Sequence, residues 1–206
     1  MREPQQLVFI SPMASLYDAA LIFLKNKIHR LPLIEVNESN GSQSLVSVLT
    51  QFRIMKFIAA NFTGKPDMLQ SSLRDLKLGT FDNVTVAKPS TTLTELLTIC
   101  ASRTVSCVPI VDEFGTVLDV FEKYDVSSLV EDEAYRRLDM SVQDVLSYRS
   151  RSFEGVHTCT LNDTLRSLLD TIRDTRVHRF IVVDSSSTNK FLGLVSLSDL
   201  LRLLLF

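Results

Sequence analysis

Asp199 ends a short polar pattern, Ser196-Leu197-Ser198-Asp199, that is followed directly by an apolar run. An ionised carboxylate can accept two hydrogen bonds from a cis-diol, which is what the 2′ and 3′ hydroxyls of a ribose present. The two serines lie where a helix should begin, and the unpaired backbone N–H groups of a first helical turn favour an anion. The pattern is therefore suited to a sugar that carries a phosphate.

His178 and Arg179 come just before another apolar run, which is rich in β-branched residues. Arginine offers a planar fork of donors to a phosphate, and histidine adds a donor whose charge is tunable near neutral pH. A single pair of this kind is usually a solvated strand edge. Here the pair recurs as His29 and Arg30, which favours a functional role. The diol acceptor, the phosphate donors and the helix start together indicate a nucleotide site.

Three segments of the chain align with one another without gaps, at 15–32, 92–109 and 164–181. Each begins with Ser or Thr as a helix N-cap, continues with apolar residues at helical spacing, and changes to an apolar, strand-like run. A short extended stretch precedes each segment, and a second strand and a second helix follow it. The fold class is therefore α/β (α+β), with a β-α-β-β-α unit repeated three times.

The repeats and the linkers between them divide the chain. We expect repeats at 8–62, 80–131 and 152–206, with linkers at 63–79 and 132–151. Helices are expected in the linkers at 68–78 and 133–148. In the first repeat the second strand is expected at 46–53 and the second helix at 54–60. In the middle repeat the second strand is expected at 117–125 and the second helix at 126–131. Each repeat must bury one face of its sheet, so neighbouring repeats should pair, which leaves one of three without a partner.

Composition excludes several classes of protein. The 206 residues are 45% hydrophobic and 22% charged with a net charge of −2, which is ordinary for a soluble globular protein and gives no footprint for nucleic acid. No apolar run approaches transmembrane length, so we expect no membrane partner and an intracellular, cytoplasmic or nuclear location. No P-loop, zinc-protease, nucleophile-elbow or Cys-x-x-Cys motif occurs, which argues against an enzyme.

The repeats resemble the cystathionine-β-synthase-type (CBS) repeat, and the whole chain resembles the gamma regulatory subunits of AMP-activated protein kinase, the SNF1 kinase complex of fungi. The resemblance runs from about residue 8 to the end and rests on six stretches: NKIHRLPLI (26–34), SVLTQFRIMKF (47–57), LKLGTFDNV (76–84), RSFEGVHTC (151–159), RVHRFIVVD (176–184) and LVSLSDLL (194–201). That family has four repeats in two pairs, and the first repeat has no counterpart here. The resemblance implies one complete CBS pair, or Bateman module, plus one unpaired CBS repeat.

The resemblance implies energy sensing without catalysis. AMP, ADP and ATP, the last with or without Mg, would compete for clefts between repeats, with no other cofactor. The expected partners are a kinase catalytic alpha subunit, a scaffolding beta subunit, and a second copy of the chain through the unpaired repeat. The nucleotide-binding residues implied by position are His29, Arg30, Thr80, Thr85, Ser106, Lys123, Asp125, Arg149, His157, His178, Arg179, Ser196, Ser198 and Asp199.

Some positions depart from the simplest pattern. Arg53 stands at the ribose-carboxylate position of the first repeat, so that repeat should hold no diol. Phe52 replaces a phosphate-binding lysine of animal relatives, and Glu122 replaces the hydroxyl residue three positions before Asp125. These departures leave two alternatives open, a ligand-insensitive scaffold of the same kinase complex and a module for another adenosyl ligand. The preferred nucleotide and the competence of the Asp125 site also stay open.

Overall fold

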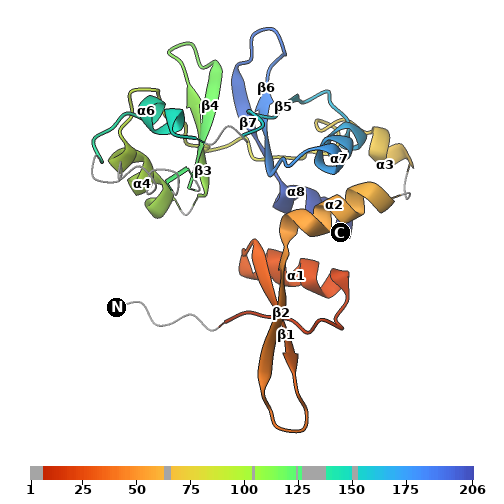
Figure 1. Ribbon diagram of the computed structural model, residues 1–206. Coiled ribbons are helices and arrows are strands. Elements are labelled where there is room, and N and C mark those ends of the chain that lie inside the picture. Colours follow the sequence, from red (N-terminus) through yellow and green to blue (C-terminus); the bar gives the residue numbers. More distant parts are fainter. Residues whose placement is uncertain (1–6, 63–65, 104, 124, 127–137, 150–152) are drawn as a thin grey trace. The chain divides into compact units, whose positions relative to one another are not determined.

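The computed structural model describes residues 7–62, 66–103, 105–123, 125–126, 138–149 and 153–206 (Figure 1). The chain divides into two compact units, each built from separated segments. The first unit draws on 1–71, 164–178 and 196–206, and the second on 72–163 and 179–195. The third repeat therefore contributes its helices to one unit and most of its strands to the other.

The first unit is a hairpin with helices. Its elements are α1 (Leu16–Asn26), β1 (Arg30–Val36), β2 (Gln43–Thr50), α2 (Gln51–Asn61), α3 (Pro66–Gln70), α7 (Leu165–Asp174) and α8 (Leu197–Leu205). Strands β1 and β2 pair antiparallel with one irregularity between Leu33 and Ile34. Helix α2 contacts α7 and α8, and α1 contacts α8. Helices from the first and third repeats therefore bury their apolar faces together.

The second unit contains two small sheets. Its elements are α4 (Leu93–Ser102), β3 (Cys107–Val111), β4 (Val117–Glu122), α6 (Val142–Ser147), β5 (Thr158–Thr160), β6 (Arg179–Val183) and β7 (Phe191–Ser196), whose last residue belongs to the first unit. Strands β3 and β4 pair antiparallel, and the other sheet has the order β5-β6-β7, with β5 and β6 parallel.

Two hydrophobic clusters hold the second unit together. In one, α4 and α6 pack on the β3–β4 hairpin through residues such as Leu96, Val108 and Val145. In the other, the opposite face of that hairpin packs against β6, with Val117 and Val120 facing Ile181 and Val183. The predicted pairing of the second and third repeats is confirmed by this second cluster.

The helix starts follow the predicted caps. Ser15, Thr92 and Thr164 are the N-caps of α1, α4 and α7, and each side chain accepts a hydrogen bond from the backbone N–H three residues on. This bond satisfies one of the donors that a first helical turn leaves unpaired. The three helix-to-strand segments predicted from the alignment are confirmed.

Some predicted boundaries are wrong. The strand expected to end at Arg53 ends at Thr50, because Thr50 caps α2 and the helix begins at Gln51. The helix expected over 68–78 ends at Gln70. Beyond it, Ser72 bonds locally to Asp75, and the N–H groups of Leu73 and Arg74 donate to a distant segment, so the backbone bonds of a helix are replaced.

Parts of two other predicted helices lie outside the described residues. The strand expected over 117–125 ends at Glu122, and Asp125 is already helical. Of the helix expected over 126–131, only Val126 is described, and it is helical. Of the linker helix expected over 133–148, residues 138–148 are described, and the helix there is α6, capped by Ser141. No helix in the described ranges combines the length and apolar character that a membrane crossing needs.

Candidate functional site

Asp199 lies in the first turn of α8, where it forms a capping box with Ser196. The Ser196 hydroxyl accepts from the Asp199 N–H at 3.2 Å, and Asp199 Oδ2 accepts from the Ser196 N–H and hydroxyl at 2.9 and 2.7 Å. Within the described residues, the only charged group near Oδ1 is the Arg202 guanidinium, at 4.0 Å. One carboxylate oxygen thus remains outside the cap for a hydroxyl donor.

The same helix start recurs in the other repeats with different chemistry. In the first repeat Thr50 accepts from the N–H of Arg53, so the third residue of the pattern carries a cation. In the middle repeat Glu122 donates its N–H to Asp125 Oδ2 at 2.7 Å. The three-residue spacing therefore caps a helix in the first and third repeats, and in the middle repeat the described part of the pattern is the bond from the Glu122 N–H to Asp125. The middle and third repeats place a carboxylate at this position.

Gln51 links two repeats inside the first unit. Its side chain is buried, with an exposed fraction of 3%, and its amide nitrogen donates to Ser198 Oγ at 2.8 Å. Its amide oxygen lies 2.9 Å from His29 Nδ1. Two predicted site residues are brought together by this glutamine, which the sequence did not single out. The sequence carried no signal for this bridge, because Gln51 lay within a predicted strand.

His178 is exposed and stacks obliquely on Phe52, with ring centroids 4.9 Å apart. The Lys56 ammonium lies 5.9 Å from the centroid of the same phenyl ring. Phe52 stands where the resemblance led us to expect the loss of a phosphate-binding cation, and Lys56 on the next helical turn carries a cation near it. Lys56 was not among the predicted residues.

Asp125 and Arg149 bind each other in the second unit. Arg149 Nε and Nη2 donate to the two carboxylate oxygens of Asp125 at 2.8 and 2.7 Å, and both side chains are nearly fully buried. The rest of the guanidinium bonds Asp119 Oδ1 at 2.9 Å and the Val120 carbonyl at 2.6 Å. Phe153 lies 3.9 Å from the guanidinium carbon. The predicted ribose acceptor and a predicted phosphate donor are therefore paired.

These contacts also set the ionisation of Arg149. Burial lowers the pKa of the guanidinium, but hydrogen bonds and charge from Asp125, followed by Asp119, outweigh burial and raise that pKa above its usual value. Arg149 is therefore a permanent cation held between two carboxylates. Asp119 was not among the predicted residues. Its place on β4, six positions before Asp125, gives no hint in the sequence of a shared arginine.

Arg179 lies beside Glu122. Arg179 Nε is 3.2 Å from Glu122 Oε1, which is ion-pair distance, but the N–H is not aligned with the oxygen and the buried Nε makes no hydrogen bond. We regard this as a charge contact without a directed bond. Burial raises the pKa of the nearby Cys107 thiol, and the charge of Arg179 offsets only part of that rise. Cys107 is therefore a neutral thiol at neutral pH.

The remaining predicted residues lie around these groups. Thr80 pairs with Leu194 through backbone hydrogen bonds, and the Ser106 carbonyl accepts from the Lys123 N–H at 3.0 Å. His157 lies 3.9 Å from Glu154, and its ring meets Phe180 edge-on at 6.5 Å. Thr85 is half-buried. By unit, His29, Arg30, His178, Ser196, Ser198 and Asp199 belong to the first, and the other predicted residues belong to the second.

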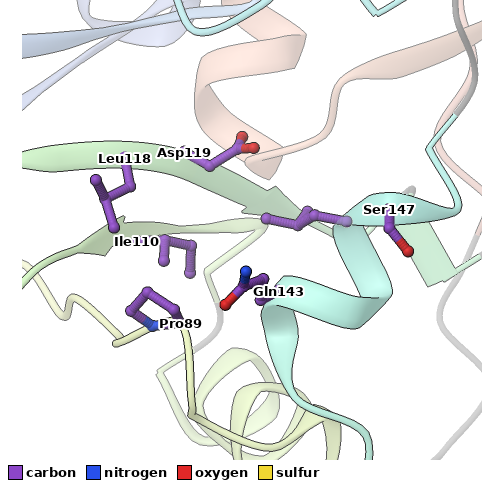
Figure 2. A pocket seen from close by; sticks show the side chains of 7 residues that line it. Pro89, Ile110, Leu118, Asp119, Gln143 and Ser147 are labelled. Carbon is purple, nitrogen blue, oxygen red and sulfur yellow. The ribbon is translucent and has the colours of Figure 1, made fainter.

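A cavity of about 390 Å³ lies elsewhere in the second unit (Figure 2). None of the predicted residues, all of which the structure describes, lines it. Asp119 contributes to its wall and also bonds the Arg149 guanidinium. The cavity is lined by Pro89, Ile110, Leu118, Asp119, Gln143, Leu146 and Ser147.

The fold, the repeat and the capped carboxylates define a class of protein. The CBS domain family matches residues 1–60, 74–132 and 151–206, and the chain belongs to this family. Among solved structures, protein MJ1225 of Methanocaldococcus jannaschii, proposed to be an archaeal homologue of gamma-AMPK, gives a TM-score of 0.70 at 18% identity, covering 96% of this chain and 67% of that one. CBSX2 in complex with AMP gives 0.52 at 21% identity over 65% of this chain and 96% of that one.

Within the class, the chain is similar to gamma subunits of 5′-AMP-activated protein kinase. It is 40% identical to that of Saccharomyces cerevisiae over 95% of this chain and 60% of the relative, and 42% identical to that of Kluyveromyces lactis over 99% and 62%. It is 36% identical to human gamma-3 over 96% of this chain and 40% of the relative. The chain thus spans about three fifths of the two fungal relatives' length.

Proposed function

We propose that this chain is a non-catalytic, adenine-nucleotide-sensing regulatory subunit of a Ser/Thr protein kinase of the AMP-activated type. The observation that carries the proposal is the Ser196–Asp199 start of α8. There the cap uses one carboxylate oxygen, Oδ2, and the other lies beside the open first turn of a helix. The similarity to gamma subunits over nearly the whole chain supports the same reading.

In this proposal Asp199 binds the ribose hydroxyls, and the residues around it bind phosphate. The helix N-terminus and the hydroxyls of Ser196 and Ser198 suit an anion, and the ring nitrogens of His29 and His178 add donors. AMP, ADP and ATP would share the sugar site and differ in how many basic groups their phosphates reach. Mg would accompany ATP alone.

The proposed partners are a catalytic alpha subunit and a scaffolding beta subunit, in the cytoplasm or the nucleus. The similarity to gamma subunits supports partners of this kind. A ligand can shift the kinase only through a difference in its affinity for two states of the complex. Self-association through the first repeat is a further proposal and is argued in the Discussion.

A ligand-insensitive scaffold of the same complex is the second candidate. The mutual pairing of Asp125 and Arg149 and the contact of Arg179 with Glu122 favour it, because each takes a predicted ligand-binding group out of use. The repeats 8–62, 80–131 and 152–206 would then serve only as a docking platform.

A thermal-unfolding titration with AMP, ADP and ATP separates the candidates. At about a hundred times its dissociation constant, a bound nucleotide stabilises the native state by roughly 2.7 kcal/mol. We expect AMP to raise the unfolding midpoint of the wild-type chain and Asp199→Ala to abolish that rise. A matched control is Asp170→Ala, on the exposed face of α7 in the same unit. No shift with any nucleotide would favour the scaffold.

A further inference from the structure

The guanidinium of Arg149 is largely occupied by protein groups. Its Nε donates to Asp125 Oδ1, its Nη2 to Asp125 Oδ2 and the Val120 carbonyl, and its Nη1 to Asp119 Oδ1. Four of its five N–H donors are thus used. The plane also lies 3.9 Å from the Phe153 ring, which adds a cation–π contact. A side chain with these contacts has little left to offer a phosphate.

The carboxylate of Asp125 is largely occupied as well. Both oxygens accept from Arg149, and Oδ2 also accepts from the Glu122 N–H, so three of its about four acceptor positions are used. The two hydroxyls of a ribose need two of these positions, so the diol cannot bind until Arg149 leaves. Separating the pair leaves two buried charges without a counter-ion, unless one ligand supplies hydroxyls to Asp125 and an anion to Arg149 at the same time.

We infer that Asp119 is a specificity-determining residue, because it holds Arg149 on Asp125 and so keeps the nucleotide site of the second repeat closed. Asp119 is only partly buried, with an exposed fraction of 33%, while Arg149 is at 9%. It bonds the nitrogen of Arg149 that Asp125 does not use. Arg149 can therefore leave Asp125 only if it also breaks its ion pair with Asp119, so that two ion pairs are lost instead of one. The uncharged ring of Phe153 also holds Arg149 in place, through its cation–π contact.

The inference rests on the proposed function and concerns its second site. In the wild-type chain one nucleotide binds, through Asp199. Weakening the hold on Arg149 opens the second site, which then takes ligands that carry both a diol and a phosphate. The closed pair discriminates against adenosine, because adenosine cannot compensate the released guanidinium.

Isothermal titration with AMP tests this through the number of sites per chain. We expect one site in the wild-type chain and two in Asp119→Asn and in Phe153→Leu, with the added site lost when Asp125→Ala is combined with either. The second site should bind AMP at least about tenfold tighter in these variants, the factor for one charge-assisted hydrogen bond of ~1.4 kcal/mol. Adenosine should gain less than AMP.

Glu113→Gln is the matched control, because it removes a negative charge from the exposed turn of the same hairpin and should leave one site. Phe153→Leu changes no charge, so a second site in this variant would show that the effect does not come from net charge. A loss of stability in a variant would not by itself add a binding site. Two sites in the wild-type chain, one of them lost in Asp125→Ala, would overturn the inference and leave the proposed function intact. One site in Asp119→Asn would also overturn it. No AMP site in the wild-type chain but an Asp125-dependent site in Asp119→Asn would refute the proposed role of Asp199 and support the inference.

Discussion

At the level of single residues, the Arg149–Asp125 pair is the most consequential feature, because two groups suited to a ligand bind each other. The residue types predicted a diol acceptor at Asp125 and a phosphate donor at Arg149, and both roles stay predictions. Nothing in their spacing indicated that they would meet. Their contact depends on the path of residues 138–149, which brings Arg149 under β4.

Removing one member of the Arg149–Asp125 pair should lower the free energy of unfolding strongly. We expect Arg149→Met to destabilise the fold by about 3–5 kcal/mol, because the buried Asp125 carboxylate loses its counter-ion. Chemical denaturation of the wild-type chain, both single variants and Arg149→Met/Asp125→Asn measures this. The double variant should be more stable than the sum of the single changes predicts. Additive losses would show that the pair is not coupled.

Cys159 gives a prediction about pH. Burial raises the pKa of its thiol to about 12 from an ordinary value of 9.0, with a smaller contribution from Asp163. The fold therefore favours the neutral thiol, and this contribution is complete below pH 9 and is lost as the pH rises towards 12. Unfolding midpoints between pH 8 and 11 should fall more steeply in the wild-type chain than in Cys159→Ala. Equal slopes would contradict the shift.

At the level of elements, the helix starts show what the sequence could predict. Ser or Thr before an apolar helical pattern identified three N-caps correctly, since capping is a local effect of neighbouring residues. The start of α2 was placed three residues late, because Gln51 and Phe52 read equally well as the end of a strand. The helix over 68–78 failed because its backbone donors bond a distant segment.

In the candidate site, too, features of neighbouring residues were predictable and contacts with distant segments were not. Asp199 and its cap were predictable, because four consecutive residues create them. The bridge from His29 through Gln51 to Ser198 was not, since it joins residues brought together only by the packing of α2 and α8. Features formed by neighbouring residues could be predicted from the sequence, and contacts between residues far apart in the chain could not.

Helix α2 allows a test of the cap. Arg53 occupies the position that holds Asp199 in α8, and a cation in a first turn opposes the helix dipole. We expect Arg53→Asp to stabilise the fold by about 1 kcal/mol by completing a capping box with Thr50, with Arg53→Ala in between. Denaturant unfolding measures the order. Equal stability of the two variants would contradict the role of the cap.

At the level of the whole molecule, the first repeat presents the face that the other two repeats bury. Val117 and Val120 of β4 are 6% and 4% exposed because they pack against β6. The corresponding residues of β2 are Leu45 and Val48, which are 65% and 38% exposed. We propose that this face pairs with the same face of a second copy.

Sedimentation velocity tests the self-association. Leu45→Glu should shift the wild-type chain towards a monomer by placing a charge in the buried face. Val46→Glu is the matched control, because Val46 is 54% exposed and its counterpart Leu118 is 52% exposed even in the paired repeat. An equal effect of both changes, or a monomeric wild-type chain, would contradict the proposal.

The discontinuity of the first unit has a consequence for synthesis in the cell. Helices α1 and α2 leave the ribosome early, but α8, which packs on both, is made last. At roughly 5–20 residues per second, the interval from Asn61 to Leu197 lasts on the order of ten seconds. During that time α2, which carries the buried Ile54 and Met55, lacks the contacts that α8 makes with it. The first unit can therefore be completed only after all segments of the second unit have been made.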